Sequence, residues 1–400
     1  MDRNRPERLA EVPRHHTTDR PWRSALRGSR ADRMTTSVTA SVPPRIAELV
    51  VTPRPGDLAL LDRAADALRA LDDDHGARLA PLGALLARTE AVASSRIEDE
   101  HADLVDYARA VVGIRANTSA TMMVAATAAV RRLSDDAAGG AVTESSILAA
   151  HRALMRDDPV DGRDAGRYRT VQNWIGGGRT PRLATYVPPP PELVPDAMAD
   201  LLAFTARDDV HPIVQAAVAH AQFESVHPFT DGNGRIGRAL VGAVFRRRGL
   251  TTSVTAPVAA ALVADRARYF DHLVRYRFGS VHDFVADLAV AVGTACDEAS
   301  VTALLLAEHA DSPGVDDLLD DPVLTEDRAS ELAERSGVTT DDLVARLVRA
   351  GTIRPVTARR RNRAWLVTAV AAELDAFAER VHAAVLDTTA PDEDPHTVAA

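Results

Sequence analysis

The chain has 400 residues, of which 46% are hydrophobic and 4% aromatic, and its formal net charge is -10. This length suffices for two or three domains, and an alanine-rich composition with few aromatic residues favours helices over large sheets. The negative charge argues against nonspecific nucleic-acid binding by the whole surface. A single cysteine, Cys296, excludes an intrachain disulfide and a cysteine-cluster metal site. We find no run of about twenty apolar residues and no secretory signal, and we therefore expect a cytoplasmic protein without a membrane span.

The N-terminal third divides into two predicted segments. Residues 1–40 are rich in arginine, with scattered proline and histidine, and we expect them to be disordered. Met34 is a candidate for the true start, because folded-looking sequence begins soon after it. Residues 41–120 form the second segment, where apolar residues recur every three or four positions from Leu58 to about Val112. This spacing predicts a helical lobe.

The predicted core extends over residues 121–306. Helical patterns cover 121–133 and 147–154, and two more, 213–223 and 236–245, flank a short polar loop. Between these pairs, two short apolar runs surround a centre rich in glycine and proline over residues 166–188. That arrangement predicts a small β-hairpin, in which Trp174 and Tyr186 are either core aromatics or substrate contacts.

The C-terminal region is predicted to be a separate small unit. Residues 307–321 are acidic and contain proline and glycine, as expected of a linker, and residues 386–400 are expected to be a disordered tail. Between them, over 322–385, two helical patterns (328–335 and 340–350) and two strands (352–356 and 364–367) are typical of a winged helix-turn-helix. The basic run Arg359–Arg363 could meet DNA phosphates, but Asp341 and Asp342 would repel a duplex. We therefore favour target binding or self-association over DNA binding.

The most informative segment is the loop between the two central helical patterns, His-Pro-Phe-Thr-Asp-Gly-Asn-Gly-Arg-Ile-Gly-Arg, residues 227–238. Backbone N–H groups at a helix start lack intrahelical acceptors and face a positive dipole end, so a polyphosphate can bind there. The donors would come from Gly232, Asn233 and Gly234, with forked hydrogen bonds from Arg235 and Arg238. Asp231 offers the hard oxygen that Mg²⁺ prefers, and His227 could accept a proton from an attacking hydroxyl.

This motif resembles the signature of Fic-domain proteins, and every specified position is met. The resemblance implies a mainly α fold with a Fic-type helical core, a small β-hairpin flap for target docking, and a C-terminal winged helix. It also implies transfer of AMP from ATP, with Mg²⁺, to a hydroxyl of a target protein, which could be the chain itself. His227 would be the general base, Asp231 the metal ligand and Asn233 part of the anion cradle. Gly234 stands where related kinases carry lysine, which favours nucleotidyl transfer.

A second segment, Ser94-Ser95-Arg96-Ile97-Glu98, resembles the inhibitory motif of autoinhibited Fic proteins. By that resemblance, Glu98 pairs with Arg238 and displaces the γ-phosphate, and Ser94 shares its helix face. Asp99 departs from the pattern, which has glycine or asparagine there. Alternatively, Ser94 or Ser95 caps a helix whose positive end favours the acidic residues that follow.

Two other functions remain open from the sequence. The same site could remove AMP from a modified protein, with Glu98 activating water. The chain could instead be a regulator that senses nucleotide through its core and binds DNA through the winged helix. The sequence also leaves open the target protein, the signal that relieves inhibition, and whether the chain forms a homodimer.

Overall fold

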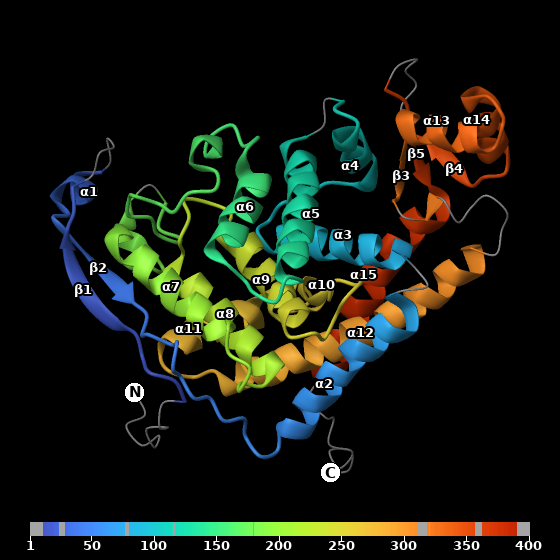
Figure 1. The fold of residues 1–400 in the computed structure, drawn as a ribbon. Coiled ribbons are helices and arrows are strands. Elements are labelled where there is room, and N and C mark those ends of the chain that lie inside the picture. The colour runs from blue at the N-terminus through green and yellow to red at the C-terminus, as the bar shows by residue number, and fades with distance from the viewer. Residues whose placement is uncertain are drawn as a thin grey trace, which may run out of the picture.

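The computed structural model describes residues 11–23, 29–76, 80–114, 117–178, 180–310, 318–319, 321–356 and 362–389. The fold is mainly α, as predicted, with two small antiparallel sheets (Figure 1). The helices are α1 (Arg30–Met34), α2 (Leu58–Leu71), α3 (Ala80–Ile97), α4 (Leu104–Val111), α5 (Thr118–Ala137), α6 (Glu144–Met155), α7 (Val194–Thr205), α8 (Pro212–Val226), α9 (Asn233–Arg247), α10 (Val258–Leu262), α11 (Arg266–Arg277), α12 (His282–Ala310), α13 (Glu326–Arg335), α14 (Thr340–Arg349) and α15 (Thr368–Thr389). The strands are β1 (His16–Pro21), β2 (Ser37–Val42), β3 (Val323–Thr325), β4 (Ile353–Pro355) and β5 (Ala364–Val367).

The centre of the molecule is the pair α8 and α9, joined by the loop of residues 227–232. Every residue of α8 from Ile213 to Val226 is buried, including polar residues such as His220 and Glu224, so all sides of this helix face the interior. Helices α5 and α6 pack against α9, while α7, α11 and α12 pack against α8 (Figure 1). The predicted helical lobe joins the same interior, because buried residues of α2 and α3 belong to one hydrophobic cluster with α8 and α9. The loop is therefore held between rigid elements.

Helix α12 is long and apolar enough on average to cross a membrane by length and composition alone, although Asp287, Asp297 and Glu298 interrupt its apolar sequence. Half of its most apolar window is buried inside the molecule. The buried side includes Leu288, Val292 and Cys296, and the helix packs on α2, α8 and α15. These contacts are those of a core helix.

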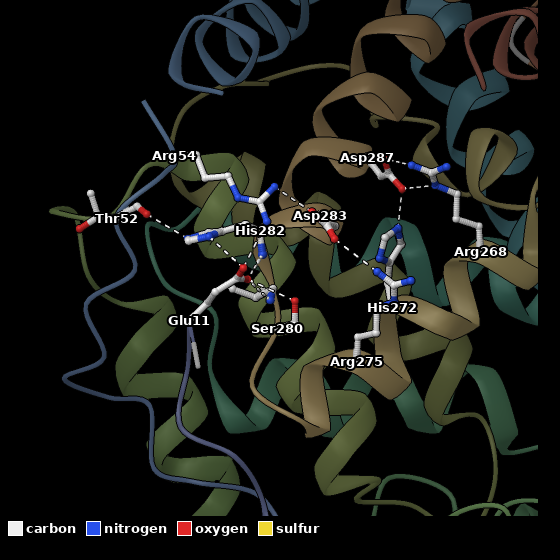
Figure 2. A network of polar contacts seen from close by, with 11 residues as sticks. Glu11, Thr52, Arg54, Arg268, His272, Arg275, Ser280, His282, Asp283 and Asp287 are labelled. Atoms are coloured by element: carbon white, nitrogen blue, oxygen red, sulfur yellow. Dashed lines mark hydrogen bonds and ion pairs between the residues drawn. The ribbon is translucent and has the colours of Figure 1, made fainter. Parts of the chain in front are cut away.

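The N-terminal segment corrects one prediction. Composition predicts disorder over residues 1–40, of which 1–10 and 24–28 lie outside the described residues. However, β1 and β2 pair over six residues each, from His16 opposite Val42 to Pro21 opposite Ser37. Upstream of β1, the Glu11 carboxylate accepts backbone N–H bonds from Val281 and His282, both at 2.7 Å. Figure 2 shows this carboxylate beside Arg54 and the start of α12. Ordering comes from partners far along the chain, which local composition does not reveal.

The same close view shows how α11 is fixed to α12. Asp283 accepts hydrogen bonds from Arg54 and Arg275, and Asp287 contacts Arg268 and His272 (Figure 2). The two acidic residues lie one turn apart on α12, so they tie α11 and the segment before α2 to one helix.

The C-terminal unit has the two predicted helices, α13 and α14, and the two predicted strands, β4 and β5. Strand β3, which was not predicted, completes a sheet of order β3-β5-β4. Its assignment as a winged helix remains a prediction. Two boundaries differ from expectation: α12 continues to Ala310, into the predicted linker, and α15 continues to Thr389, into the predicted tail. Arg363, from the basic run, is bound by Glu326 and Asp341. Residues 359–361 of that run lie outside the described residues.

Candidate active site

The loop from His227 to Gly232 is built on two residues with left-handed backbone conformation. His227 ends α8 with φ 49° and ψ 62°, and Gly232 precedes α9 with φ 76° and ψ 6°. A Cβ at Gly232 would lie 2.9 Å from the side chain of Leu154, so glycine is required both for its backbone angle and for space. Together the two residues reverse the chain and direct the start of α9 toward the loop.

Asn233 holds this loop closed through its side chain. Its Oδ1 accepts from the Phe229 N–H at 2.8 Å, and its Nδ2 donates to the Phe229 carbonyl at 3.0 Å. The Phe229 ring is fully buried and lies parallel to the ring of His151, with centroids 3.7 Å apart. The Asn233 amide therefore fixes the loop, and what it can offer an anion is its backbone N–H at the helix start.

His227 is buried beside a second titratable group. Its Nδ1 lies 3.9 Å from Glu224 Oε2, one turn earlier on α8. Burial, aided by the charge of Arg169, lowers the pKa of His227 to about 4, so the imidazole is neutral at pH 7. Burial also raises the pKa of Glu224 to about 7. Because Nδ1 faces Glu224, Nε2 is the nitrogen that remains for an incoming hydroxyl.

The two motif arginines have different surroundings. Arg235 is 6% exposed; its Nη2 donates to Asp231 Oδ2 at 3.2 Å, while its Nε and Nη1 find no acceptor among the described residues. Arg238 is 2% exposed and fully engaged: Nε donates to Ser94 Oγ at 2.8 Å and Nη2 to the Ser94 carbonyl at 2.8 Å. Buried donors without acceptors are costly, so Arg235 is suited to bind an anion.

Glu98 lies where the resemblance predicts. Its Oε1 accepts from Arg238 Nη2 at 2.7 Å, and a Cβ added at Gly234 would overlap that same oxygen. The carboxylate therefore rests on the first turn of α9, the position expected for a phosphate. Burial alone would raise the pKa of Glu98, but the neighbouring Arg238 lowers it below its usual value. The glutamate is charged at neutral pH.

The departure from the inhibitory pattern at Asp99 has a structural explanation. Asp99 adopts φ 62°, a left-handed conformation that glycine and asparagine tolerate best and aspartate next. Its carboxylate turns outward to Arg266, with one hydrogen bond at 2.8 Å, and this bond lowers the pKa of Asp99. The extra negative charge is therefore paired with a cation at the surface.

Two positioning residues were missed by sequence reasoning. Arg169 donates through Nε to the His227 carbonyl at 2.8 Å and through Nη2 to the Pro189 carbonyl at 2.6 Å, which joins the loop to the flap. His151 Nδ1 accepts from the Gly166 N–H at 2.9 Å, so its Nε2 carries the proton and donates to the Asp231 carbonyl at 3.1 Å. A lone histidine or arginine carries no local pattern that would mark it.

The flap differs in detail from the predicted hairpin. It contains one antiparallel bridge, between Ile175 and Tyr186. Tyr186 is a core residue whose hydroxyl donates to the Ser225 carbonyl at 2.6 Å, whereas Trp174 meets Trp22 of the N-terminal segment edge to face, with centroids 5.4 Å apart. Strand β2 bonds to the flap through Ser41 N–H and the Val187 carbonyl at 2.8 Å. The N-terminal strands thus support one side of the flap.

Tyr269 lies beside the motif arginine Arg238, and Asp231 lies in the loop itself. Tyr269 is 2% exposed and bonds to His220 at 2.9 Å, as expected of a packing role. Asp231 is half exposed, and no group of three or more metal-ligating side chains occurs in the described part of the chain. One exposed carboxylate suits Mg²⁺, which takes its other ligands from phosphate and water.

The fold and this loop define the class: a mainly helical protein built around a histidine-to-arginine loop between two central helices. Residues 141–244, a region that includes the whole loop, match the model of the Fic/DOC family. The protein adenylyltransferase Fic of Nematostella vectensis is 30% identical over 169 residues, which are 41% of this chain and 34% of that protein. Protein adenylyltransferase fic-1 of Caenorhabditis elegans is 32% identical over 152 residues, 37% of this chain and 27% of that protein.

The match spans about a third of the length of these curated relatives. Among solved structures, a Fic family protein from Desulfovibrio desulfuricans G20 superposes with a TM-score of 0.52 at 24% identity, covering 79% of this chain and 97% of that one. This second likeness supports the fold.

Proposed function

We propose that the protein is an adenylyltransferase that moves AMP from ATP to a hydroxyl group of a target protein, and that Glu98 holds this activity low. The proposal rests on the His227–Arg238 loop, on the match of residues 141–244 to the Fic/DOC family, and on relatives that are named protein adenylyltransferases. The names of these relatives support transfer from ATP to protein as the direction of the reaction.

Transfer needs a base, an anion site and an aligned phosphate. A neutral His227 Nε2 takes the proton of the target hydroxyl as the oxygen attacks the α-phosphorus. The bond from that phosphorus to the bridging oxygen breaks, and pyrophosphate leaves with its charge held by Arg235, Arg238 and the amides that open α9. Donors placed in a buried site before the reaction stabilise developing charge without reorganisation.

Mg²⁺ would be held by the carboxylate of Asp231, and when bound it would neutralise charge between the phosphates. Asp231 lies at the open side of the loop and is anchored by Arg235 Nη2 and, through its carbonyl, by His151. The chain's own contribution here is to fix the position of one carboxylate.

One observation supports the proposed inhibition: the carboxylate of Glu98 is hydrogen-bonded to Arg238 on the first turn of α9. A carboxylate in that place competes with the outermost phosphate for both the guanidinium and the helix start. ATP would then bind in a pose whose α-phosphorus is poorly aligned for attack, and misalignment of this kind is costly.

The test is transfer of radiolabelled AMP in a lysate and on the purified protein, with wild type, Glu98→Gly and His227→Ala. We expect labelling to rise with Glu98→Gly and to vanish in the double variant that also carries His227→Ala. Equal labelling by wild type and Glu98→Gly would refute inhibition. Labelling that survives loss of His227 would refute the role of the imidazole.

A second experiment distinguishes AMP transfer from the reverse reaction, the removal of AMP from a modified protein. A target carrying AMP is incubated with wild type and with Glu98→Gly. Transfer as the main activity predicts no release of AMP by either protein, whereas release by wild type alone would favour removal.

A further inference from the structure

A cavity of about 500 Å³ lies between α3, α4, α10 and α15, apart from the loop described above. Its apolar walls include Val92, Leu104, Met123 and Leu374. Arg88, Val92 and Arg96 line it at four-residue spacing on one face of α3, whereas Ser94 and Glu98 occupy another face. A volume of this size suits a small organic molecule.

The cavity contains one buried cation. Arg88 is 5% exposed, its guanidinium stacks on the ring of Tyr107 at 3.8 Å, and its Nε and Nη1 have no acceptor among the described residues. Burial lowers the pKa of Arg88, and the charges of Asp321 and Asp375 raise it. Neither carboxylate forms an ion pair with Arg88 within the described part of the chain. A buried guanidinium without a bonded anion is an unfavourable arrangement that a ligand can relieve.

The mouth of the cavity limits the charge of that ligand. Asp103, Asp375 and Glu379 line it as exposed residues and outnumber the two other titratable side chains there, Arg96 and His382. Three carboxylates repel di- and triphosphates, while a single negative group on an apolar body can pass them and reach the buried arginine. The chemistry of the cavity therefore selects against nucleotides.

We propose that this cavity binds a small monocarboxylate with an apolar body, its carboxylate paired with Arg88. Helix α3 carries both Arg88 and Ser94, which accepts hydrogen bonds from Arg238, so a molecule that binds the cavity more tightly in this arrangement of α3 than in any other stabilises the contact of Glu98 with Arg238. The ligand thus acts as an effector that strengthens inhibition; this second step rests on the proposed function, whereas binding does not.

Binding is measured by NMR on protein labelled at its six methionine methyl groups. Met123 lines the cavity, and Met155 lies under the loop, where its sulfur is 4.0 Å from Arg235 Nη2. Phenylacetate, 4-phenylbutyrate and octanoate are each compared with the primary amide of the same skeleton. We expect a saturable shift of Met123 by at least one acid, with roughly tenfold weaker binding of its amide, since only the acid forms a charged pair.

Two variants complete the test. Arg88→Met keeps an apolar stem and should abolish the preference for the acid, while Ala378→Trp fills the cavity and should abolish binding without touching Arg88. No Met123 shift by any acid on folded wild type, or equal binding of acid and amide, would overturn the site. If Arg88→Met fails to fold, Ala378→Trp and the acid-to-amide comparison decide.

The proposed effect of the bound acid on inhibition is tested separately, by AMP labelling. The bound acid should lower AMP labelling by wild type and leave labelling by Glu98→Gly unchanged. Equal inhibition of both would overturn the coupling through Glu98. Mg-ATP should shift the NMR signal of the Met155 methyl group in Glu98→Gly, and this shift tests the proposed function separately. If Mg-ATP causes no shift of Met155, the conclusion drawn from Met123 about binding of the acid still holds.

Discussion

Replacing Glu98 by glutamine isolates the charge of the inhibitory contact, because glutamine keeps the shape and one oxygen acceptor. Arg238 has a side chain 1% exposed and Glu98 one 37% exposed, and their 2.7 Å bond is the only ion pair of Arg238 among the described residues. Removing one partner of a fully buried pair costs about 3–5 kcal/mol, whereas an exposed pair contributes about 0–1 kcal/mol. Since solvent reaches Glu98 and Ser94 keeps two hydrogen bonds to Arg238, we expect a loss of about 1–2 kcal/mol.

The assay combines thermal unfolding with AMP labelling. Without nucleotide, Glu98→Gln should unfold a few degrees below wild type. Mg-ATP should raise its melting temperature by more than that of wild type, because phosphate replaces the missing anion. Labelling should rise, though less than with Glu98→Gly. Asp99→Asn is the matched control, because it removes a neighbouring carboxylate charge whose contact with Arg266 is exposed. It should change neither the melting temperature nor the AMP labelling. A Glu98→Gln protein as stable as wild type and no more active would refute the reasoning.

Three further outcomes are expected. Because the pKa of Glu224 is raised, the folded protein holds a proton that the unfolded chain releases, so the free energy of unfolding falls as pH rises from the ordinary pKa of 4.5 toward about 7. Glu224→Gln should therefore reduce the difference in unfolding free energy between pH 5.5 and pH 8 by about 2 kcal/mol. Urea titrations that give the same difference for wild type and Glu224→Gln would contradict this. Asn233→Ala leaves the buried Phe229 N–H without its acceptor and should cost about 1–3 kcal/mol of stability, seen in the same titrations, and abolish labelling. Asp32→Ala removes the acceptor in α1 that holds Thr180 and Arg182 of the flap, and hydrogen exchange should then speed up at the Ile175 and Tyr186 amides. Equal exchange would show that the Asp32 contacts do not support the flap.

The central helices and the loop between them were predictable because their evidence is local. Apolar spacing marks α8 and α9, and glycine at a left-handed position marks the turn before Asn233. The contact between Glu98 and Arg238 joins residues 140 positions apart, and it was predicted only because a family resemblance names both ends. Without that resemblance, the acidic run after Ser95 would pass as a helix end.

What the sequence did not yield depends on distant partners. Strand β1 has an arginine-rich neighbourhood, yet its segment is fixed where Glu11 caps the start of α12, some 270 positions later. His151 and Arg169 orient the loop through single bonds to backbone carbonyls, and single residues of either type have no spacing to detect. Disorder was inferred from composition, and composition does not include the surface on which a segment lies.

In the proposed function, inhibition and catalysis both depend on one physical requirement of Arg238. Its guanidinium is buried, and a buried charge without an anion is costly, so the site must contain a negative group whether nucleotide is bound or not. Glu98 supplies that group in the structure, and the outermost phosphate would supply it in a productive complex. The exchange is therefore between two anions of similar geometry at one helix start, and the balance can be shifted by a modest change in the position of α3. By the same reasoning, a ligand of the proposed cavity site, which Arg88 lines on another face of the same helix, would alter the proposed activity without contacting its reacting groups.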